Sequence, residues 1–130
     1  MKKLFSTLAL SLTCIASAHA GVVVIGNTGT TDISKGDAKK AFLGKGSSYV
    51  VYELDEGNAT RSEFHGAVTG KSDAQLKAYW SKQVFTGKGN PPATVSDAAA
   101  MKAAVASDAN AIGYIDEADL DSSVKVIFKP

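Results

Sequence analysis

The sequence predicts an α/β fold, namely a single three-layer domain built around a mainly parallel central sheet. Two observations predict it. Short β-branched runs alternate with longer helix-forming segments, which is the pattern of a sheet covered by helices. The first run, Val22–Ile25, is apolar at every position, as is typical of a strand that is buried on both faces.

The first helix is expected between Asp32 and Gly44. Ser34 can cap its start, because a side-chain oxygen there accepts a hydrogen bond from a free N–H of the first turn. Ala38 and Phe42 are spaced by one helical turn and would share the buried face. Gly44 ends the helix, since glycine takes the left-handed backbone conformation without strain.

A second strand, Tyr49–Leu54, is rich in β-forming residues, and a second helix is expected from near Thr60 to about Val68. The third helix, Ser72–Phe85, begins with a capping box in which Ser72 and Gln75 bond to each other's backbone N–H. Its expected apolar face consists of Leu76, Tyr79, Trp80 and Val84.

The last third of the chain continues the alternation. After a loop rich in Gly and Pro at Thr86–Pro92, a fourth helix is expected over Ser96–Ser107. Two strands follow, over Ala111–Ile115 and Val124–Phe128.

Residues 1–20 are typical of a cleavable secretory signal peptide. Two lysines open the segment, a mostly apolar stretch covers Leu4–Ile15, and Ala18-His19-Ala20 places small residues where a signal peptidase reads them. The apolar stretch is too short to span a bilayer, which takes about 20 predominantly apolar residues. We therefore expect an exported, periplasmic protein whose working domain is Gly21–Pro130.

The mature chain would have 130 − 20 = 110 residues, enough for one domain with a substantial core but not for two. Its formal charge would be 14 − 2 − 13 = −1, without the concentrated basic patch of a nucleic-acid surface. Cleavage removes Cys14, the only cysteine, and leaves His65 as the only histidine. No serine lies in a G-x-S-x-G turn. We therefore expect neither an enzyme nor a metal or other cofactor.

The stretch Gly57–Phe64 joins small residues to a helix start. The first N–H groups of a helix lack intrahelical partners and carry the positive end of the helix dipole, so they can bind an anion. Thr60 would add a hydroxyl donor, Asn58 an amide donor, and Arg61 two parallel N–H groups.

The same residues admit a purely structural interpretation. Thr60 or Asn58 would cap the helix, and Arg61 would pair with a carboxylate on the surface. The carboxylates considered are Asp55, Glu56 and Glu63.

Four segments follow one another in a specific order: Ala41–Lys45, Gly57–Phe64, Tyr79–Pro92 and Ala111–Ile115. They resemble the patterns I-F-x-G-K, G-S-G-T-R-x-x-F, Y-W-S-x-x-x-F-T-G-x-G-x-P-P and A-I-G-Y-V of the periplasmic phosphate-binding proteins of phosphate ABC transporters, in particular their short single-lobe relatives. The resemblance implies one lobe of a type II periplasmic binding protein, with the second segment as the phosphate-binding turn.

The chain departs from the family at this turn. Asn58 and Ala59 replace the Ser and the second Gly, and Leu54 stands where full-length members place an Arg. Full-length members close two lobes over phosphate, whereas this chain resembles the second lobe alone. The resemblance therefore implies weak binding of phosphate or a similar small oxyanion. The expected contacts are Asn58, Ala59, Thr60 and Arg61, with Asn27 or Thr28 after the first strand.

A homodimer or a partner protein would complete the cleft. The alternative function is an interaction or accessory module, derived from a phosphate-binding lobe, that no longer binds ligand. Its candidate contact surfaces are the Tyr79–Trp80 region and the Gly87–Pro92 loop. We expect no nucleic-acid partner and, after signal cleavage, no attachment to a membrane.

The signal peptide can be tested directly on protein purified from the periplasm of an expressing cell. We expect the amino-terminal sequence to begin at Gly21, because Ala18 and Ala20 form the small-residue cleavage signal. Mass spectrometry of the intact chain checks this. A chain that begins at Met1, or one that carries lipid on Cys14, would contradict the prediction.

Overall fold

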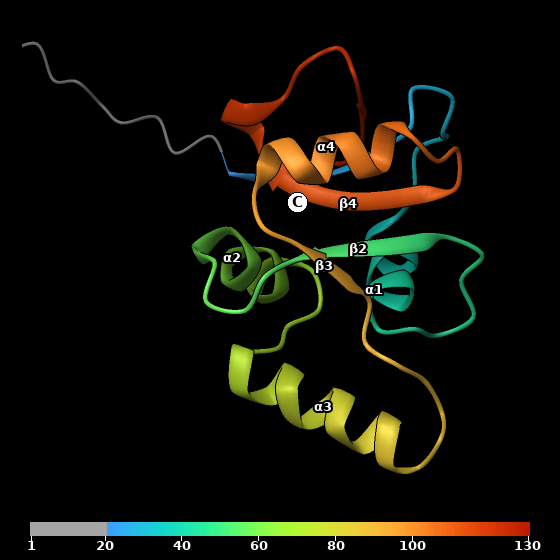
Figure 1. The fold of residues 1–130 in the computed structure, drawn as a ribbon, viewed down its shortest axis with the longest axis vertical. Coiled ribbons are helices and arrows are strands. Elements are labelled where there is room, and N and C mark those ends of the chain that lie inside the picture. Colours follow the sequence, from blue (N-terminus) through green and yellow to red (C-terminus); the bar gives the residue numbers. More distant parts are fainter. Residues whose placement is uncertain (1–20) are drawn as a thin grey trace, which may run out of the picture.

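The computed structural model describes residues 21–130, so the expected signal peptide lies outside the described residues. Strands and helices alternate along this part of the chain, and a short 3-10 helix, η1, precedes the last strand (Figure 1). The elements are β1 (Val22–Gly26), α1 (Lys35–Phe42), β2 (Val50–Leu54), α2 (Ala59–Ala67), α3 (Asp73–Phe85), β3 (Ala93–Val95), α4 (Ala98–Ala106), β4 (Ala111–Asp116), η1 (Glu117–Asp119) and β5 (Lys125–Phe128).

The strands form a five-stranded sheet in the order β3-β2-β4-β1-β5. β2 is parallel to β3 and β4, whereas β1 is antiparallel to both of its neighbours, β4 and β5. All strands except β1 therefore run in one direction. The expected α/β domain with a mainly parallel sheet is confirmed, and the reversed β1 makes the sheet mixed. β1 is buried along its whole length, as its apolar run predicts.

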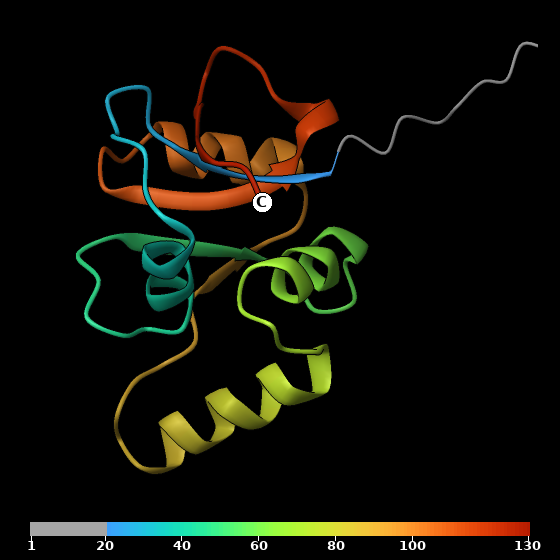
Figure 2. The same cartoon turned by 180° about the vertical axis from the view of Figure 1, so that it is seen from behind.

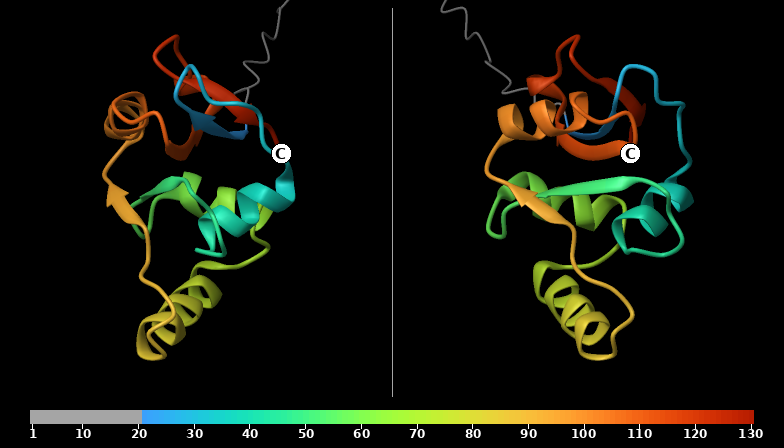
Figure 3. Two further views of the ribbon diagram at one scale, coloured as in Figure 1. Left: turned by 90° about the vertical axis from the view of Figure 1, so that its right-hand side faces the viewer. Right: turned by 45° about the vertical axis from the view of Figure 1, so that its right-hand side comes forward.

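Helices cover both faces of the sheet, which gives three layers (Figures 2 and 3). β4 shows the alternation, because successive side chains of a strand point to opposite faces. The Tyr114 ring lies against Phe42 of α1 and stacks on Phe64 of α2, with ring centroids 5.7 and 4.0 Å away. Gly113 faces α4, where Met101 packs over its backbone.

α3 lies outside these layers, at the far end of the molecule from α4 (Figure 1). It is held by a small cluster of its own, in which Leu76 and Trp80 pack on Leu43. The Tyr79 hydroxyl adds a hydrogen bond of 2.5 Å to the Leu43 carbonyl. The Trp80 indole Nε1 is buried without a hydrogen-bond partner. An unpaired polar group of this kind costs about 1–3 kcal/mol, so the attachment of α3 is weaker than the apolar contacts alone suggest.

Three details differ from the expectation. β3 was not predicted, because it is short, mostly exposed and follows two prolines. The fourth helix begins at Ala98 with Asp97 as its cap, not with Ser96. Val84 is 51% exposed rather than buried, since the last turn of α3 extends past the cluster that holds Leu76 and Trp80. The capping box of Ser72 and Gln75 is confirmed.

Gly113 allows the close approach of α4, and this can be tested. A Cβ atom at this position would lie 2.3 Å from Met101 Sδ. We expect Gly113→Ala to lower the free energy of unfolding by about 1–3 kcal/mol, because α4 or Met101 must move. Gly66→Ala is the matched control, since Gly66 lies in exposed helix with no atom near its would-be Cβ. It should raise stability slightly, by about 0.5–1 kcal/mol. Urea unfolding of both variants measures the difference; equal effects would contradict the prediction.

Candidate functional site

The helix start at Asn58 lies directly after a tight turn. The Asn58 N–H donates to the Asp55 carbonyl at 3.1 Å, and Gly57 supplies the positive φ of 86° that this turn requires. The Asn58 side chain then caps α2, because its Oδ1 accepts from the Thr60 N–H at 2.9 Å. Asn58 is therefore the cap that one of the two sequence interpretations named.

The backbone donors at this helix start are largely engaged within the chain. The N–H groups of Arg61 and Ser62 both donate to the Asn58 carbonyl, at 3.1 and 3.3 Å. Because Asn58 Oδ1 faces the Thr60 N–H, the amide nitrogen of the same side chain is turned away from the first turn. The remaining side-chain donors here are this amide and the Thr60 hydroxyl.

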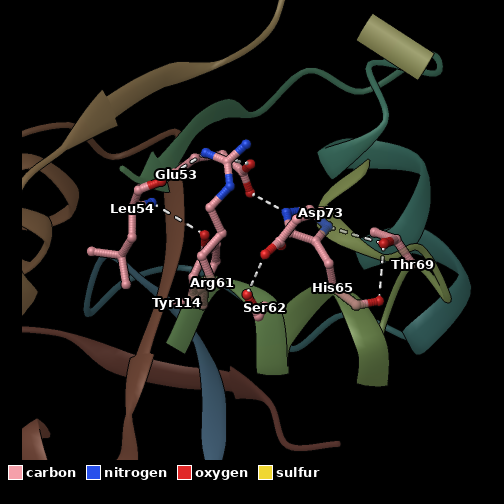
Figure 4. Close-up of polar contacts among 8 residues, drawn as sticks. All are labelled: Glu53, Leu54, Arg61, Ser62, His65, Thr69, Asp73 and Tyr114. Carbon is pink, nitrogen blue, oxygen red and sulfur yellow. Dashed lines mark hydrogen bonds and ion pairs between the residues drawn. The ribbon is translucent and has the colours of Figure 1, made fainter. Parts of the chain in front are cut away.

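The Arg61 side chain points back into the protein and is almost completely buried (Figure 4). Its Nη1 donates to the Leu54 carbonyl at 2.7 Å and lies 3.4 Å from Glu53 Oε2. Arg61 thus pairs with Glu53, a carboxylate that sequence reasoning did not consider. One feature of the sequence could have identified this carboxylate: Glu53 is a lone acidic residue inside a β-forming run, eight positions before Arg61.

Glu53 is the centre of a buried polar network. It is 1% exposed, and its Oε1 lies 2.7 Å from Nε2 of His65, which is fully buried. Tyr114 lies nearby: burial, followed by the negative charge of Glu53, raises the pKa of the Tyr114 phenol well above its usual value. The phenol therefore stays protonated, and its oxygen accepts from the Leu54 N–H at 3.1 Å.

Both ring nitrogens of His65 are occupied. The Thr69 hydroxyl donates its single hydrogen to the His65 carbonyl at 3.0 Å. The same oxygen lies 3.0 Å from His65 Nδ1, so Thr69 also occupies this ring nitrogen. Since Nε2 faces Glu53, the imidazole has no nitrogen left for a ligand. His65 is a packed structural residue, and residues 21–130 contain no cluster of His, Cys, Asp and Glu side chains that could hold a metal ion.

Asn27 and Thr28 lie at the opposite end of the sheet from this turn. Gly26 and Val51 both pair with Ile112, from the two sides of β4. The end of β1 is therefore level with the beginning of β2, whereas the turn follows the end of β2, about 10 Å further along. Figure 1 shows the loop after β1 and helix α2 at opposite ends of the strands. One small ion cannot contact both groups.

Asn27 has its own structural role. Its Nδ2 donates to the Ala106 carbonyl at the end of α4 at 3.1 Å, and its Oδ1 accepts from the Gly29 N–H at 3.2 Å. Thr28 is exposed in the same turn. The reversed direction of β1 places these residues here; a β1 parallel to its neighbours would have ended beside the Asn58 turn.

A cavity of about 200 Å³ opens beside Arg61. It is bounded on one side by the turn and on the other by the first half of α3. Its walls carry charges of both signs, because Arg61 and Lys77 face Glu56 and Asp73 across it. Gly57 and Ala74 complete the lining. The Asp73 carboxylate also joins the two helices, since it accepts from the Ser62 hydroxyl at 2.7 Å.

The fold is similar to that of proteins whose structures are known. No family model and no curated protein sequence matches the chain. Its structure is similar to an ABC-type phosphate transport receptor from Vibrio cholerae, with a TM-score of 0.62 and 19% identity over 82% of this chain and 45% of the receptor. It is also similar to a phosphate ABC transporter substrate-binding protein with bound phosphate from Clostridium perfringens, with a TM-score of 0.64 and 21% identity over 82% and 44% of the two chains.

The chain thus has the fold of phosphate ABC transporter substrate-binding proteins and spans less than half of the length of either one. The expected resemblance to a single lobe is confirmed at the level of the fold. Both neighbours are described as receptors or binding proteins rather than as enzymes. Within residues 21–130, no helix is long and apolar enough to cross a membrane.

The ion pair between Glu53 and Arg61 can be tested by removing one charge. Glu53→Gln keeps the shape of the side chain but leaves the buried guanidinium without its counter-charge. We expect the free energy of unfolding to fall by about 3 kcal/mol or more. Glu56→Gln, an exposed carboxylate in the neighbouring turn, should change it by less than about 0.5 kcal/mol. Chemical denaturation of both variants gives the comparison, and similar values for the two would show that the network adds no stability.

Proposed function

We propose that this is a non-enzymatic periplasmic protein of the solute-binding type, which binds phosphate or a similar small oxyanion weakly at the start of α2. The contacts would come from Asn58, Ala59, Thr60 and Arg61. The observation that carries the proposal is the cavity beside Arg61, which opens at a helix amino terminus within a phosphate-receptor fold.

The electrostatics of the cavity support a weak site rather than a strong one. Arg61 already interacts with Glu53, so only part of its charge acts on a ligand. Lys77 adds a positive charge, while Glu56 and Asp73 oppose it. Charged contacts in a site open to water are also worth much less than in an enclosed one. Phosphate binding in the range of about 0.1–1 mM, or about 4–5.5 kcal/mol, fits these conditions.

The proposal is tested by isothermal titration calorimetry with phosphate, sulfate and a carboxylate. Asn58→Asp is the informative variant, because the aspartate still caps the helix while it replaces an N–H donor with a negative charge. We expect it to weaken phosphate binding about tenfold or more without unfolding the protein. A folded wild-type protein that gives no heat with any of the three anions would refute oxyanion binding.

Thr28→Asp is the matched control for the change in net charge. It adds the same charge at the opposite end of the sheet, on an exposed residue. Phosphate binding should stay within about twofold of wild type. An equal loss in the two variants would mean that net charge, and not a site at Asn58, governs the binding.

The second candidate is the interaction or accessory module that binds no ligand. The observation in its favour is that the Arg61 guanidinium is turned inward to Glu53 and Leu54, a structural use that needs no anion. Under this hypothesis, changes at the Asn58 turn leave the biological role intact, and changes on an exposed apolar surface abolish it. A deletion strain complemented with Asn58→Asp separates the two functions.

A further inference from the structure

One face of α3 is left uncovered by the rest of the molecule. It contains two adjoining hollows, of about 200 and about 530 Å³, which share Glu56, Arg61 and Lys77 and so form one continuous groove. The helix contributes residues at spacings of three and four, which therefore lie on one side of it. These residues are Asp73, Ala74, Lys77, Trp80, Ser81, Val84 and Phe85.

The carboxyl end of this face carries large apolar side chains. Phe85 is 92% exposed and Val84 is 51% exposed, beside Pro91 in the wall of the larger hollow. An aromatic ring that stands this far into water costs free energy unless something covers it. Lys88 lies three residues beyond the end of α3, directly after Gly87, whose φ is 68°.

The amino end of the same face has the opposite character. Ala74 is small, and the 200 Å³ hollow lies next to it. A cavity of about 150 Å³ is enough to hold a benzene ring. Asp73 and Glu56 stand at this end together with Arg61 and Lys77, so the hollow has acidic groups within a lining of mixed charge. The face thus changes from a small residue beside a hollow, with carboxylates within reach, to large protruding side chains followed by a lysine.

We propose that a second copy of this chain docks on the groove, with the two α3 helices antiparallel about a twofold axis. In this arrangement each Phe85 enters the hollow beside Ala74 of the other copy. Each Lys88 comes near Glu56 and Asp73 of the other copy. In an antiparallel pair, the protruding end of each helix lies against the hollow end of the other, so the same contact forms twice. A twofold interface needs this kind of self-complementary surface.

The size of the surface sets the strength of the association. α3 has 13 residues and is therefore about 20 Å long. A contact of this length falls at or below the low end of stable protein interfaces, about 1,200 Å² of total buried area. The dimer is accordingly weak and depends on protein concentration. The dimer forms without an oxyanion, but Phe85 and phosphate would compete for the cavity beside Arg61. A measurement without phosphate therefore tests the dimer independently of the proposed phosphate binding.

Sedimentation equilibrium in phosphate-free buffer tests the proposal, with protein from about 10 µM to about 1 mM. We expect the wild-type mass to rise from one chain toward two. Phe85→Ser should raise the dissociation constant about 30-fold or more, because two rings leave the contact at once. Since Phe85 is outside the core, the variant should melt at the wild-type temperature.

Leu120→Ser is the matched control, because Leu120 is an exposed apolar residue, at 37%, in the segment that follows η1. It should leave the dissociation constant unchanged. Lys88→Glu should weaken the dimer a few-fold, and adding Glu56→Lys in the same chain should restore it, as expected for charges that meet across the contact.

Three results would overturn the proposal. The first is a wild-type protein that stays a single chain up to about 1 mM. The second is a dimer that Phe85→Ser does not weaken, or that Leu120→Ser weakens equally. The third is a mass that passes two chains toward larger assemblies, because a closed twofold contact stops at two.

Discussion

The buried carboxylate of Glu53 organises the half of the molecule that carries the candidate site. A charge at 1% exposure is tolerated only when it is paired and hydrogen-bonded. Its partners Arg61 and His65 both come from α2, and the Tyr114 ring of β4 stacks on Phe64 of the same helix. Since Glu53 itself lies on β2, this one group fixes how α2 sits against the sheet, and with it where the Asn58 turn points.

The same network determines the position of Arg61 and how much of its positive charge is available to a ligand. Arg61 is held rigidly and close to the cavity, which favours binding without a loss of side-chain freedom. Its charge is shared with Glu53, which limits the attraction for an anion. A site of this kind gains affinity chiefly from being enclosed, and less than half of a phosphate receptor's length is present to enclose it. Shape around the cavity, more than added positive charge, would decide how tightly an oxyanion is held.

Local patterns in the sequence predicted most of the fold. Some features depend only on neighbours in the chain, and the structure contains each of them: the caps Ser34 and Ser72, the β-branched first strand and the buried Ala38–Phe42 pair. The direction of β1 and the short strand β3 depend on which strands lie side by side, and no local pattern records that. For the same reason the sequence placed Asn27 and Thr28 with the Asn58 turn, whereas the sheet separates them.

The candidate site was predictable in position but not in its contacts. Asn58 as cap and Arg61 in the first turn are visible in Gly57–Phe64. The sequence favours Asp55, Glu56 and Glu63 as partners of Arg61, because these carboxylates are close to it in the chain and lie in polar surroundings. Glu53 was overlooked since a carboxylate inside a strand is seldom buried. Glu53 can be buried because β2, α2 and β4 pack around it, which places Arg61 and His65 where they offset the cost of removing its carboxylate from water.

The separate attachment of α3 has a consequence for motion. Its anchor is a cluster of Leu43, Leu76 and Trp80, apart from the main core, with one unpaired indole N–H. Elements with few buried contacts open at a fraction of the global unfolding free energy, as cooperative units of their own. α3 and the loop after it would therefore detach before the sheet does. Because Asp73, Ala74 and Lys77 line one wall of the cavity at Arg61, that wall leaves with the helix. The cavity therefore exists only while α3 is docked on the domain. A ligand bound in the cavity would stabilise this docked position of the helix.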